Sequence, residues 1–398
     1  MEHLVIVGAS RAGLFAVEGA RRAGFAGRIT LVGAEPHVPY DRPPLSKEYL
    51  TTSGPVPPDP LYRTPQVLRD KLGVEVRTGT RATRLDVDTR TVWLGEHPLD
   101  YSALVIATGA TARRLPATSH LAGVHTLRTL DDARRLRAEF ARRPATVVIG
   151  AGLIGSEVAS AARERDLPVT VVESMPVPLV RVVGEQSGKV CAALHERHGT
   201  ELVTGVHVTA IKGTDRVERV ELSDGRSLKA SLVVVGVGAE PEIGWLCDSG
   251  LQLPDGVRCD ATLNAGAPGV YAAGDVVQWH DANVGRWRRL ENWTSAAEQG
   301  RVAGRNAARP SEPEMYATVP YVWSDQYGSR LQFVGDCEAD EIVVVRDRED
   351  DETYLALYRT GGRLTGAFGI NQTRVLPKLR AVIRRRARFD EAVGAVEA

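Results

Sequence analysis

The sequence predicts an α/β chain with two units of parallel sheet and helix, followed by a smaller domain of a different kind. The first two units are predicted by a repeat: an apolar run, a glycine turn and a helical segment occur in that order near residue 8 and again near residue 150. Strand, helix and strand within about 30 residues form the unit of a doubly wound parallel sheet. The last domain is predicted by short alternating segments that follow one another from about Val319.

The first copy of the repeat opens the chain. Its parts are the run Leu4–Val7, the turn Gly8–Gly13, a helix from about Leu14 to Ala23, the run Ile29–Val32 and then Glu35. In a dinucleotide-binding turn the first glycine makes the bend, the second lets the backbone approach the pyrophosphate, and the third lets helix pack on strand. Ser10 takes the second position here, where it either crowds the phosphates or donates its hydroxyl to one. This turn alone leaves nucleotide binding open.

The second copy of the repeat is complete. Its parts are the run Thr146–Ile149, the glycines Gly150, Gly152 and Gly155, a helix from about Ser156 to Arg165, the run Val169–Val172 and then Glu173. Phosphates bind at such a helix N-terminus because unpaired N–H groups and the positive end of the dipole face them. Glu173 would accept hydrogen bonds from ribose hydroxyls and repel a 2′-phosphate. Although Arg181 follows at some distance, we expect NADH rather than NADPH.

The last part of the chain has a different pattern. Successive antiparallel strands are expected at Leu331–Val334, Glu341–Val345, Thr353–Leu357 and Leu364–Ile370, and a basic helix is expected from about Arg374 to Arg388. A length of 398 residues allows two or three domains of about 150 residues each.

Composition excludes several classes of function. Lys plus Arg and Asp plus Glu both number 50, and this balance argues against a nucleic-acid binder. The start of the chain lacks the pattern of a signal peptide, and the apolar runs are shorter than the roughly 20 residues of a membrane helix. We therefore expect a cytoplasmic protein. The four cysteines have no close spacing, so neither a redox dithiol nor a metal site is expected.

Seven motifs spread over the whole chain carry a family resemblance. They are Gly8–Gly13, Tyr40–Lys47, Ala107–Gly109, Gly150–Glu157, Tyr271–Asp275, Glu291–Trp293 and Trp323–Gly328. With them the chain resembles the FAD-dependent NADH:ferredoxin reductases of bacterial oxygenase systems, the putidaredoxin reductase type within the pyridine nucleotide-disulfide oxidoreductases. The resemblance implies two interleaved Rossmann-like domains and a C-terminal α+β domain. The implied boundaries are 1–112 and 239–315 for FAD, 113–238 for NADH and 316–398 for the C-terminal domain.

The resemblance also implies the site residues. Lys47, Glu157 and Trp293 are the implied catalytic set: Lys47 lies beside the flavin and pairs with Glu157, a pair that could shift as NADH binds, and Trp293 lies over or beside the isoalloxazine. Read from the residues alone, Lys47 could equally be solvated and Glu157 a helix-start acid. The implied FAD residues are Gly8, Ser10, Gly13, Glu35, Arg42, Lys47, Thr108, Gly109, Gly274, Asp275 and Trp293. The implied NADH residues are Gly150, Gly152, Gly155, Glu157 and Glu173.

The implied partner is an acidic iron–sulfur ferredoxin that feeds an oxygenase, and the reductase itself is expected as a monomer or weak dimer. An acidic partner predicts a basic docking face, for which Arg63, Arg289 and Trp323 are the candidates together with Arg288. The run Arg384–Arg386 is a second candidate, although a solvated helix face explains it as well. An NADH oxidase or rubredoxin reductase on the same scaffold stays an alternative, as does a redox-regulated interaction protein resembling apoptosis-inducing factor.

Overall fold

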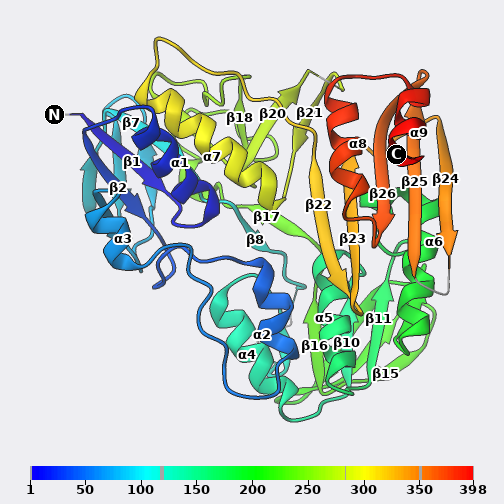
Figure 1. The fold of residues 1–398 in the computed structure, drawn as a ribbon. Coiled ribbons are helices and arrows are strands. Elements are labelled where there is room, and N and C mark those ends of the chain that lie inside the picture. The colour runs from blue at the N-terminus through cyan, green and yellow to red at the C-terminus, as the bar shows by residue number, and fades with distance from the viewer. Residues whose placement is uncertain (1, 117–120, 283, 349–351, 398) are drawn as a thin grey trace. The chain divides into compact units, whose positions relative to one another are not determined.

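The computed structural model describes residues 2–116, 121–282, 284–348 and 352–397 (Figure 1). Within it the chain forms two compact units. Unit 1 contains residues 1–41, 59–111 and 240–318, and unit 2 contains residues 42–58, 112–239 and 319–398. Each unit therefore collects segments that are far apart in the sequence. The predicted boundaries of the FAD, NADH and C-terminal domains stay a prediction.

A five-stranded parallel sheet forms the centre of unit 1, with the strand order β19-β7-β1-β2-β3. The strands are β1 (His3–Val7), β2 (Arg28–Val32), β3 (Val74–Arg77), β7 (Ala103–Ile106) and β19 (Val270–Ala272). The central strands β1 and β7 are apolar runs rather than alternating ones, because a parallel sheet is buried on both faces. The first copy of the sequence repeat thus supplies β1 and β2, paired in parallel from His3 beside Arg28 to Val7 beside Val32.

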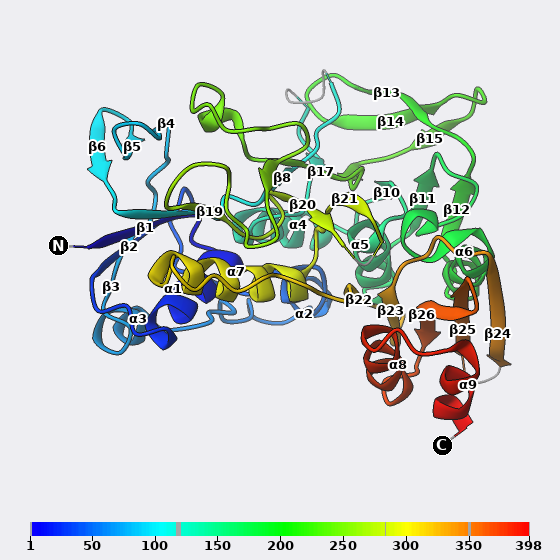
Figure 2. The ribbon, with the colours of Figure 1, turned by 90° about the horizontal axis from the view of Figure 1, so that it is seen from above.

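Helices α1 (Arg11–Arg22) and α7 (Trp293–Ala308) lie side by side in unit 1 (Figures 1 and 2). Their backbones approach closely because α7 presents glycines to α1: a Cβ on Gly300 would lie 2.4 Å from the oxygen of Ala12, and one on Gly304 would lie 2.0 Å from that of Ala16. Any larger residue at these two positions would push the helices apart. The charged side chains at the edges of the two helices are therefore brought onto one surface.

The remaining elements of unit 1 are short. An antiparallel sheet is formed by β4 (Arg84–Asp86), β5 (Thr91–Leu94) and β6 (His97–Asp100), and another sheet by β18 (Val257–Cys259), β20 (Val277–Asp281) and β21 (Arg286–Arg289). Helix α3 (Pro65–Asp70) precedes β3, and η2 (Gly244–Leu246) is a single 3-10 turn. Strands β8 (Ala110–Ala112) and β17 (Ala239–Pro241) lie where the chain passes between the units.

A second five-stranded parallel sheet lies in unit 2, with the order β12-β11-β10-β16-β9. Its strands are β9 (Val124–His125), β10 (Thr146–Ile149), β11 (Val169–Glu173), β12 (Glu201–Thr204) and β16 (Leu232–Val235). Its helices are η1 (Pro43–Ser46), α2 (Glu48–Thr51), α4 (Leu130–Phe140), α5 (Leu153–Glu164) and α6 (Val180–Arg197). An antiparallel meander of β13 (Val208–Gly213), β14 (Val217–Leu222) and β15 (Ser227–Lys229) accompanies this sheet (Figure 2).

Unit 2 ends in an antiparallel sheet with the order β22-β23-β26-β25-β24. Its strands are β22 (Tyr321–Gln326), β23 (Ser329–Gly335), β24 (Glu341–Arg348), β25 (Thr353–Thr360) and β26 (Arg363–Ile370), followed by α8 (Val375–Arg384) and α9 (Phe389–Glu397). The fold class predicted from the sequence is confirmed. The single basic helix expected to Arg388 is wrong, because α8 ends at Arg384 and Arg386 takes a left-handed φ of 53° before α9 begins.

A buried histidine links the parallel and antiparallel parts of unit 2. His195 on α6 has no exposed surface, its Nδ1 lies 2.8 Å from the hydroxyl of Tyr327, and its Nε2 lies 3.2 Å from the hydroxyl of Ser156 on α5. Burial, together with the charge of the neighbouring His198, lowers the pKa of His195 to about 4. The imidazole is therefore neutral in the folded protein at every pH above that value.

We expect the folded state to lose stability as the pH falls from about 6.5 toward 4. In this window the unfolded chain protonates His195 and the folded chain does not, so the unfolded state binds the extra proton. Between pH 7.5 and pH 5, the loss in the free energy of unfolding should be about 2 kcal/mol larger in the wild type than in His195→Gln. Urea denaturation at both pH values measures it, and equal losses in the two proteins would contradict the assignment.

Candidate active site

The first glycine turn lies between β1 and α1 in unit 1. Gly8 has a φ of +120°, and a Cβ there would lie 2.0 Å from the oxygen of Ala107 on the neighbouring strand connection. Ser10 then precedes α1 in an extended conformation, and the first turn of α1 carries no acidic side chain. An anion at this helix end would therefore meet N–H groups and no opposing carboxylate from that first turn.

The second glycine turn lies between β10 and α5 in unit 2. Gly150 has a φ of +99°, and a Cβ on it would lie 2.4 Å from the oxygen of Gly236. A Cβ on Gly155 would lie 2.0 Å from the oxygen of Gly150, so both glycines are needed for packing. Around Gly152, in contrast, no atom lies within 4 Å of an added Cβ. Its missing side chain therefore leaves open space beside a helix N-terminus, which fits a nucleotide pyrophosphate.

Two acids predicted to bind cofactor end or follow the second strand of each repeat. Glu173 ends β11, where its carboxylate accepts hydrogen bonds from the backbone N–H of Ala151 at 2.7 Å and of Met175 at 2.9 Å. The carboxylate therefore lies directly against the second glycine turn. Glu35 in unit 1 instead accepts a hydrogen bond from the hydroxyl of Tyr40 at 2.5 Å. The contact of Glu173 with ribose and that of Glu35 with FAD stay predictions.

Lys47 and Glu157 meet in unit 2. Lys47 Nζ lies 2.8 Å from Glu157 Oε1, and the Glu157 side chain is only 3% exposed while that of Lys47 is 21% exposed. Glu157 lies on α5 just after the complete glycine turn, and Lys47 ends the Tyr40–Lys47 motif after η1. The two residues implied as a pair by the resemblance are thus in contact, although 110 positions separate them.

Trp293 begins α7 and is held by a cluster in unit 1. Its indole Nε1 donates to Asp41 Oδ1 at 2.7 Å, and the guanidinium of Arg11 lies over its ring. Arg11 also donates through Nε to the backbone oxygen of Trp293 at 2.8 Å, and the hydroxyl of Tyr62 donates to the same carboxylate oxygen of Asp41 at 2.5 Å. Sequence reasoning missed Arg11, Asp41 and Tyr62 as supports of Trp293. Little in the sequence indicated this role: Arg11 and Asp41 lie inside two of the seven motifs, and Tyr62 lies in none.

The other predicted FAD residues are divided between the units. In unit 1, Thr108 follows β7, and its hydroxyl donates to the backbone oxygen of Glu242 at 2.8 Å. Gly109 and Gly274 both have positive φ, and Asp275 follows β19, where its backbone oxygen accepts a hydrogen bond from Arg289. Arg42 lies in unit 2, where it donates to the backbone oxygen of Arg128. The contacts of these residues with FAD stay predictions.

The three predicted docking residues differ in how open they are. Arg289 is only 13% exposed and is paired with Asp255 and Glu291, so two carboxylates already neutralise its charge. Arg63 is 44% exposed and contacts Glu18 at 2.9 Å. Trp323 lies in unit 2, where its ring stacks on that of Tyr321 and lies near the guanidinium of Arg330. Arg63 is thus more exposed than Arg289, and the docking roles of all three residues stay predictions.

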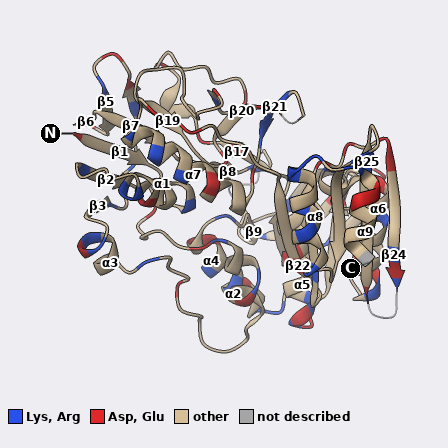
Figure 3. Cartoon of the chain, turned by 45° about the horizontal axis from the view of Figure 1, so that its top comes forward, with Lys and Arg blue, Asp and Glu red and all other residues tan. Residues whose placement is uncertain are grey.

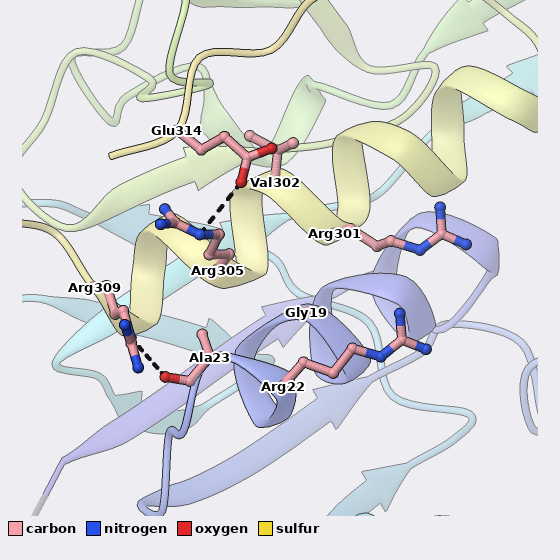
Figure 4. A pocket seen from close by; sticks show the side chains of 8 residues that line it. All are labelled: Gly19, Arg22, Ala23, Arg301, Val302, Arg305, Arg309 and Glu314. Atoms are coloured by element: carbon pink, nitrogen blue, oxygen red, sulfur yellow. Dashed lines mark hydrogen bonds and ion pairs between the residues drawn. The ribbon is translucent and has the colours of Figure 1, made fainter. Parts of the chain in front are cut away.

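A basic hollow of about 390 Å³ lies between α1 and α7 (Figure 4), and both helices carry basic residues (Figure 3). Its charged lining residues are Arg22, Arg301, Arg305, Arg309 and Glu314. Two of these arginines have partners inside the protein. Arg305 pairs with Glu314, and Arg309 donates to the backbone oxygen of Ala23. Arg22 and Arg301 extend in the same direction from the two helices. Sequence reasoning missed this face, although the spacing of four between Arg301, Arg305 and Arg309 was a signal for one side of a helix.

The four cysteines are free thiols, and Cys191 and Cys259 are buried. Burial raises the pKa of Cys191 to about 12, so its thiol stays protonated and unreactive at neutral pH. In the part of the chain that the structure describes, no group of three or more His, Cys, Asp or Glu could hold a metal ion. None of the helices formed by the described residues is both long and apolar enough to span a membrane.

Comparison with known proteins decides the family. Residues 2–300 match the family described as pyridine nucleotide-disulphide oxidoreductase, and residues 321–397 match the domain described as reductase C-terminal. The chain belongs to the pyridine nucleotide-disulphide oxidoreductases. The resemblance inferred from the seven motifs is confirmed. The chain is an oxidoreductase, and the predicted cofactors FAD and NADH are those that enzymes of this family use.

Similar proteins cover nearly the whole chain. The ferredoxin–NAD(+) reductase component of the biphenyl dioxygenase system of Paraburkholderia xenovorans (strain LB400) is 36% identical over 94% of this chain and 91% of the relative. Rhodocoxin reductase of Rhodococcus erythropolis is 36% identical over 93% of this chain and 87% of the relative. The crystal structure of the covalent putidaredoxin reductase–putidaredoxin complex matches with a TM-score of 0.92 and 30% identity, and covers 100% of this chain and 99% of the other.

Proposed function

We propose that the chain passes a hydride from NADH to FAD and then delivers electrons one at a time to an acidic iron–sulfur ferredoxin of an oxygenase system. The observation that carries the proposal is the contact between Lys47 and Glu157. It joins the helix that follows the complete glycine turn to the motif that the resemblance places beside the flavin. The whole-chain similarity to reductase components of dioxygenase systems supports the same acceptor.

When bound, FAD and NADH would supply the hydride transfer itself and the change from two-electron to one-electron transfer. The chain supplies the rest. Gly152 and the start of α5 leave room and N–H groups for the nucleotide phosphates. Glu173, whose carboxylate lies against this turn, is the residue that we expect to bind the ribose hydroxyls. Lys47 brings a positive charge held by a buried carboxylate, and Arg11 and Asp41 fix the ring of Trp293 in one orientation.

The residues of this chain favour an outward route for the electrons. A thiol relay needs two cysteines within bonding distance, and the four thiols here are free. An oxidase that reduces oxygen often has a cysteine beside the flavin, and Pro36–Lys47 contains none. The acceptor is therefore a separate protein, and rubredoxin is the alternative to ferredoxin.

The α1–α7 face suits an acidic partner. Arg22 and Arg301 lie on it, Arg63 lies in the same unit, and Glu18 offsets only part of this charge. Opposite charges on two proteins raise the rate of encounter and set their orientation. We therefore assign docking to this face together with Arg63, and Trp323 stays a candidate for the exit route.

The test compares three proteins loaded with FAD. Wild type should be bleached by NADH without oxygen and should then reduce an acidic 2Fe–2S ferredoxin. Arg301→Glu should lower kcat/KM for the ferredoxin by about tenfold or more, with NADH reduction of a small neutral dye unchanged. Arg384→Glu makes the same change of charge in the second candidate run, Arg384–Arg386, and should leave both rates unchanged because we assign docking to the α1–α7 face. A wild type that NADH does not bleach would refute the function, and equal effects of the two variants would refute the docking face. Preference for rubredoxin over ferredoxin would replace the acceptor.

A further inference from the structure

The carboxylate of Glu157 has more hydrogen-bond donors than its partner Lys47 alone. Oε1 accepts from Lys47 at 2.8 Å, from the hydroxyl of Ser324 at 2.7 Å and from the backbone N–H of Asp325 at 3.4 Å. Oε2 accepts from the hydroxyl of Ser46. Ser324 has no exposed surface and Ser46 is 3% exposed, so water does not compete for either hydroxyl. All of these residues belong to unit 2.

The hydroxyl of Ser324 has its direction fixed by a second side chain. Gln326 Nε2 donates to Ser324 Oγ at 2.9 Å, and Gln326 is fully buried. Because the amide nitrogen can only donate, Ser324 accepts from Gln326 and turns its own hydrogen toward Glu157. Both residues lie on β22, so the C-terminal sheet contributes an oriented donor to the Lys47–Glu157 pair.

We propose that Ser324 and Ser46 are positioning residues that allow Lys47 to leave Glu157 when the reaction needs its charge elsewhere. This inference rests on the proposed transfer of a hydride from NADH to FAD. It gives the C-terminal sheet a part in that step, in addition to any part in docking.

The physical reason is the cost of a buried charge. If Lys47 were the sole donor, its departure would leave an uncompensated carboxylate that is 3% exposed, and such a state is strongly unfavourable. The other three donors are the hydroxyls of Ser324 and Ser46 and the N–H of Asp325, and the lysine side chain can move without them. Each hydrogen bond to the carboxylate also weakens the attraction left for the ammonium, so the serines make the ion pair easier to open.

The position of Lys47 can be followed without turnover. FAD-loaded protein is treated with a trace of acetic anhydride, and acetylation of Lys47 is measured by mass spectrometry relative to the exposed Lys212. In Ser324→Ala, Lys47 should be acetylated about threefold to tenfold more slowly than in wild type, because the ammonium becomes the main partner of Glu157. Ser46→Ala removes the donor on the other oxygen and should act in the same direction. In Glu157→Gln, Lys47 should be acetylated faster than in wild type, because its ion-pair partner is removed.

Two further variants separate positioning from general loosening. Ser187→Ala removes an equally buried hydroxyl of unit 2, bonded to Tyr358 and not to Glu157, and should acetylate Lys47 at the wild-type rate. Ser324→Thr keeps a hydroxyl and should restore wild-type labelling. Single-turnover bleaching by NADH should slow in Ser324→Ala and recover in Ser324→Thr.

Unchanged or faster acetylation of Lys47 in both alanine variants would overturn the proposal, since a purely structural serine loosens the pair when it is removed. That outcome is distinct from failure of the proposed function, which would appear as a wild-type protein that NADH does not bleach.

Discussion

Lys47→Met is expected to lower the free energy of unfolding by about 1.5 kcal/mol, and Glu157→Gln by less than half as much. The loss is smaller than the roughly 3 kcal/mol of an uncompensated buried charge because Ser324, Ser46 and the N–H of Asp325 still donate to the carboxylate. The asymmetry follows from exposure. Removal of the lysine leaves a carboxylate that is 3% exposed, whereas removal of the carboxylate leaves a lysine that is 21% exposed and whose flexible side chain can reach water. Chemical denaturation of the single variants and the double variant measures these energies, and the double variant should regain most of the loss.

Both substitutions should slow the bleaching of FAD by NADH by about 100-fold, the usual effect of removing one oriented charge from an active site. Stability and rate are then uncoupled, because the double variant recovers the first and not the second. A double variant that recovers both would mean that the pair serves only to hold unit 2 together. Two single variants of equal stability would contradict the argument from exposure.

The sequence predicted the parts of the site that depend on short motifs. Glycine turns can be recognised in the sequence because Gly8 and Gly150 have a positive φ and a close backbone neighbour. Both features disfavour any residue with a Cβ at these positions. The acid at the end of the second strand was predictable because it is part of the dinucleotide-binding motif, and Glu173 lies against its turn. The contact between Lys47 and Glu157 could be predicted only from the family resemblance, because the sequence around either residue does not identify the other as its partner.

What the sequence could not predict depends on side chains from distant segments. Ser324 and Gln326 are ordinary strand residues until β22 packs against α5, and no local pattern marks them as donors to Glu157. The surroundings of Arg289 are another example. Its ion pair with Asp255, on a separate segment, could not be predicted from the sequence, and its role in docking stays a prediction. Charge on a surface depends on which acids the fold brings near, and the sequence alone does not specify that.

Glu173→Ser combined with Ser174→Arg is expected to reverse the preference between the two nicotinamide nucleotides. The carboxylate of Glu173 now accepts the N–H groups of Ala151 and Met175, so its removal frees two backbone donors as well as a negative charge. An arginine at the next position adds a partner for a 2′-phosphate. The ratio of kcat/KM for NADPH to that for NADH should rise by about 1,000-fold, which corresponds to several kcal/mol of like-charge contact relieved and attraction gained.

The measurement is flavin bleaching at a series of concentrations of each nucleotide. Glu35→Ser provides the matched control, since it removes the equivalent acid after the second strand of the other repeat, in unit 1, and should leave the ratio unchanged. A change of the ratio in the control but not in the double variant would exchange the assignment of the two glycine turns. FAD would then bind at Gly150 and NADH at Gly8, so this comparison also tests which repeat binds which nucleotide.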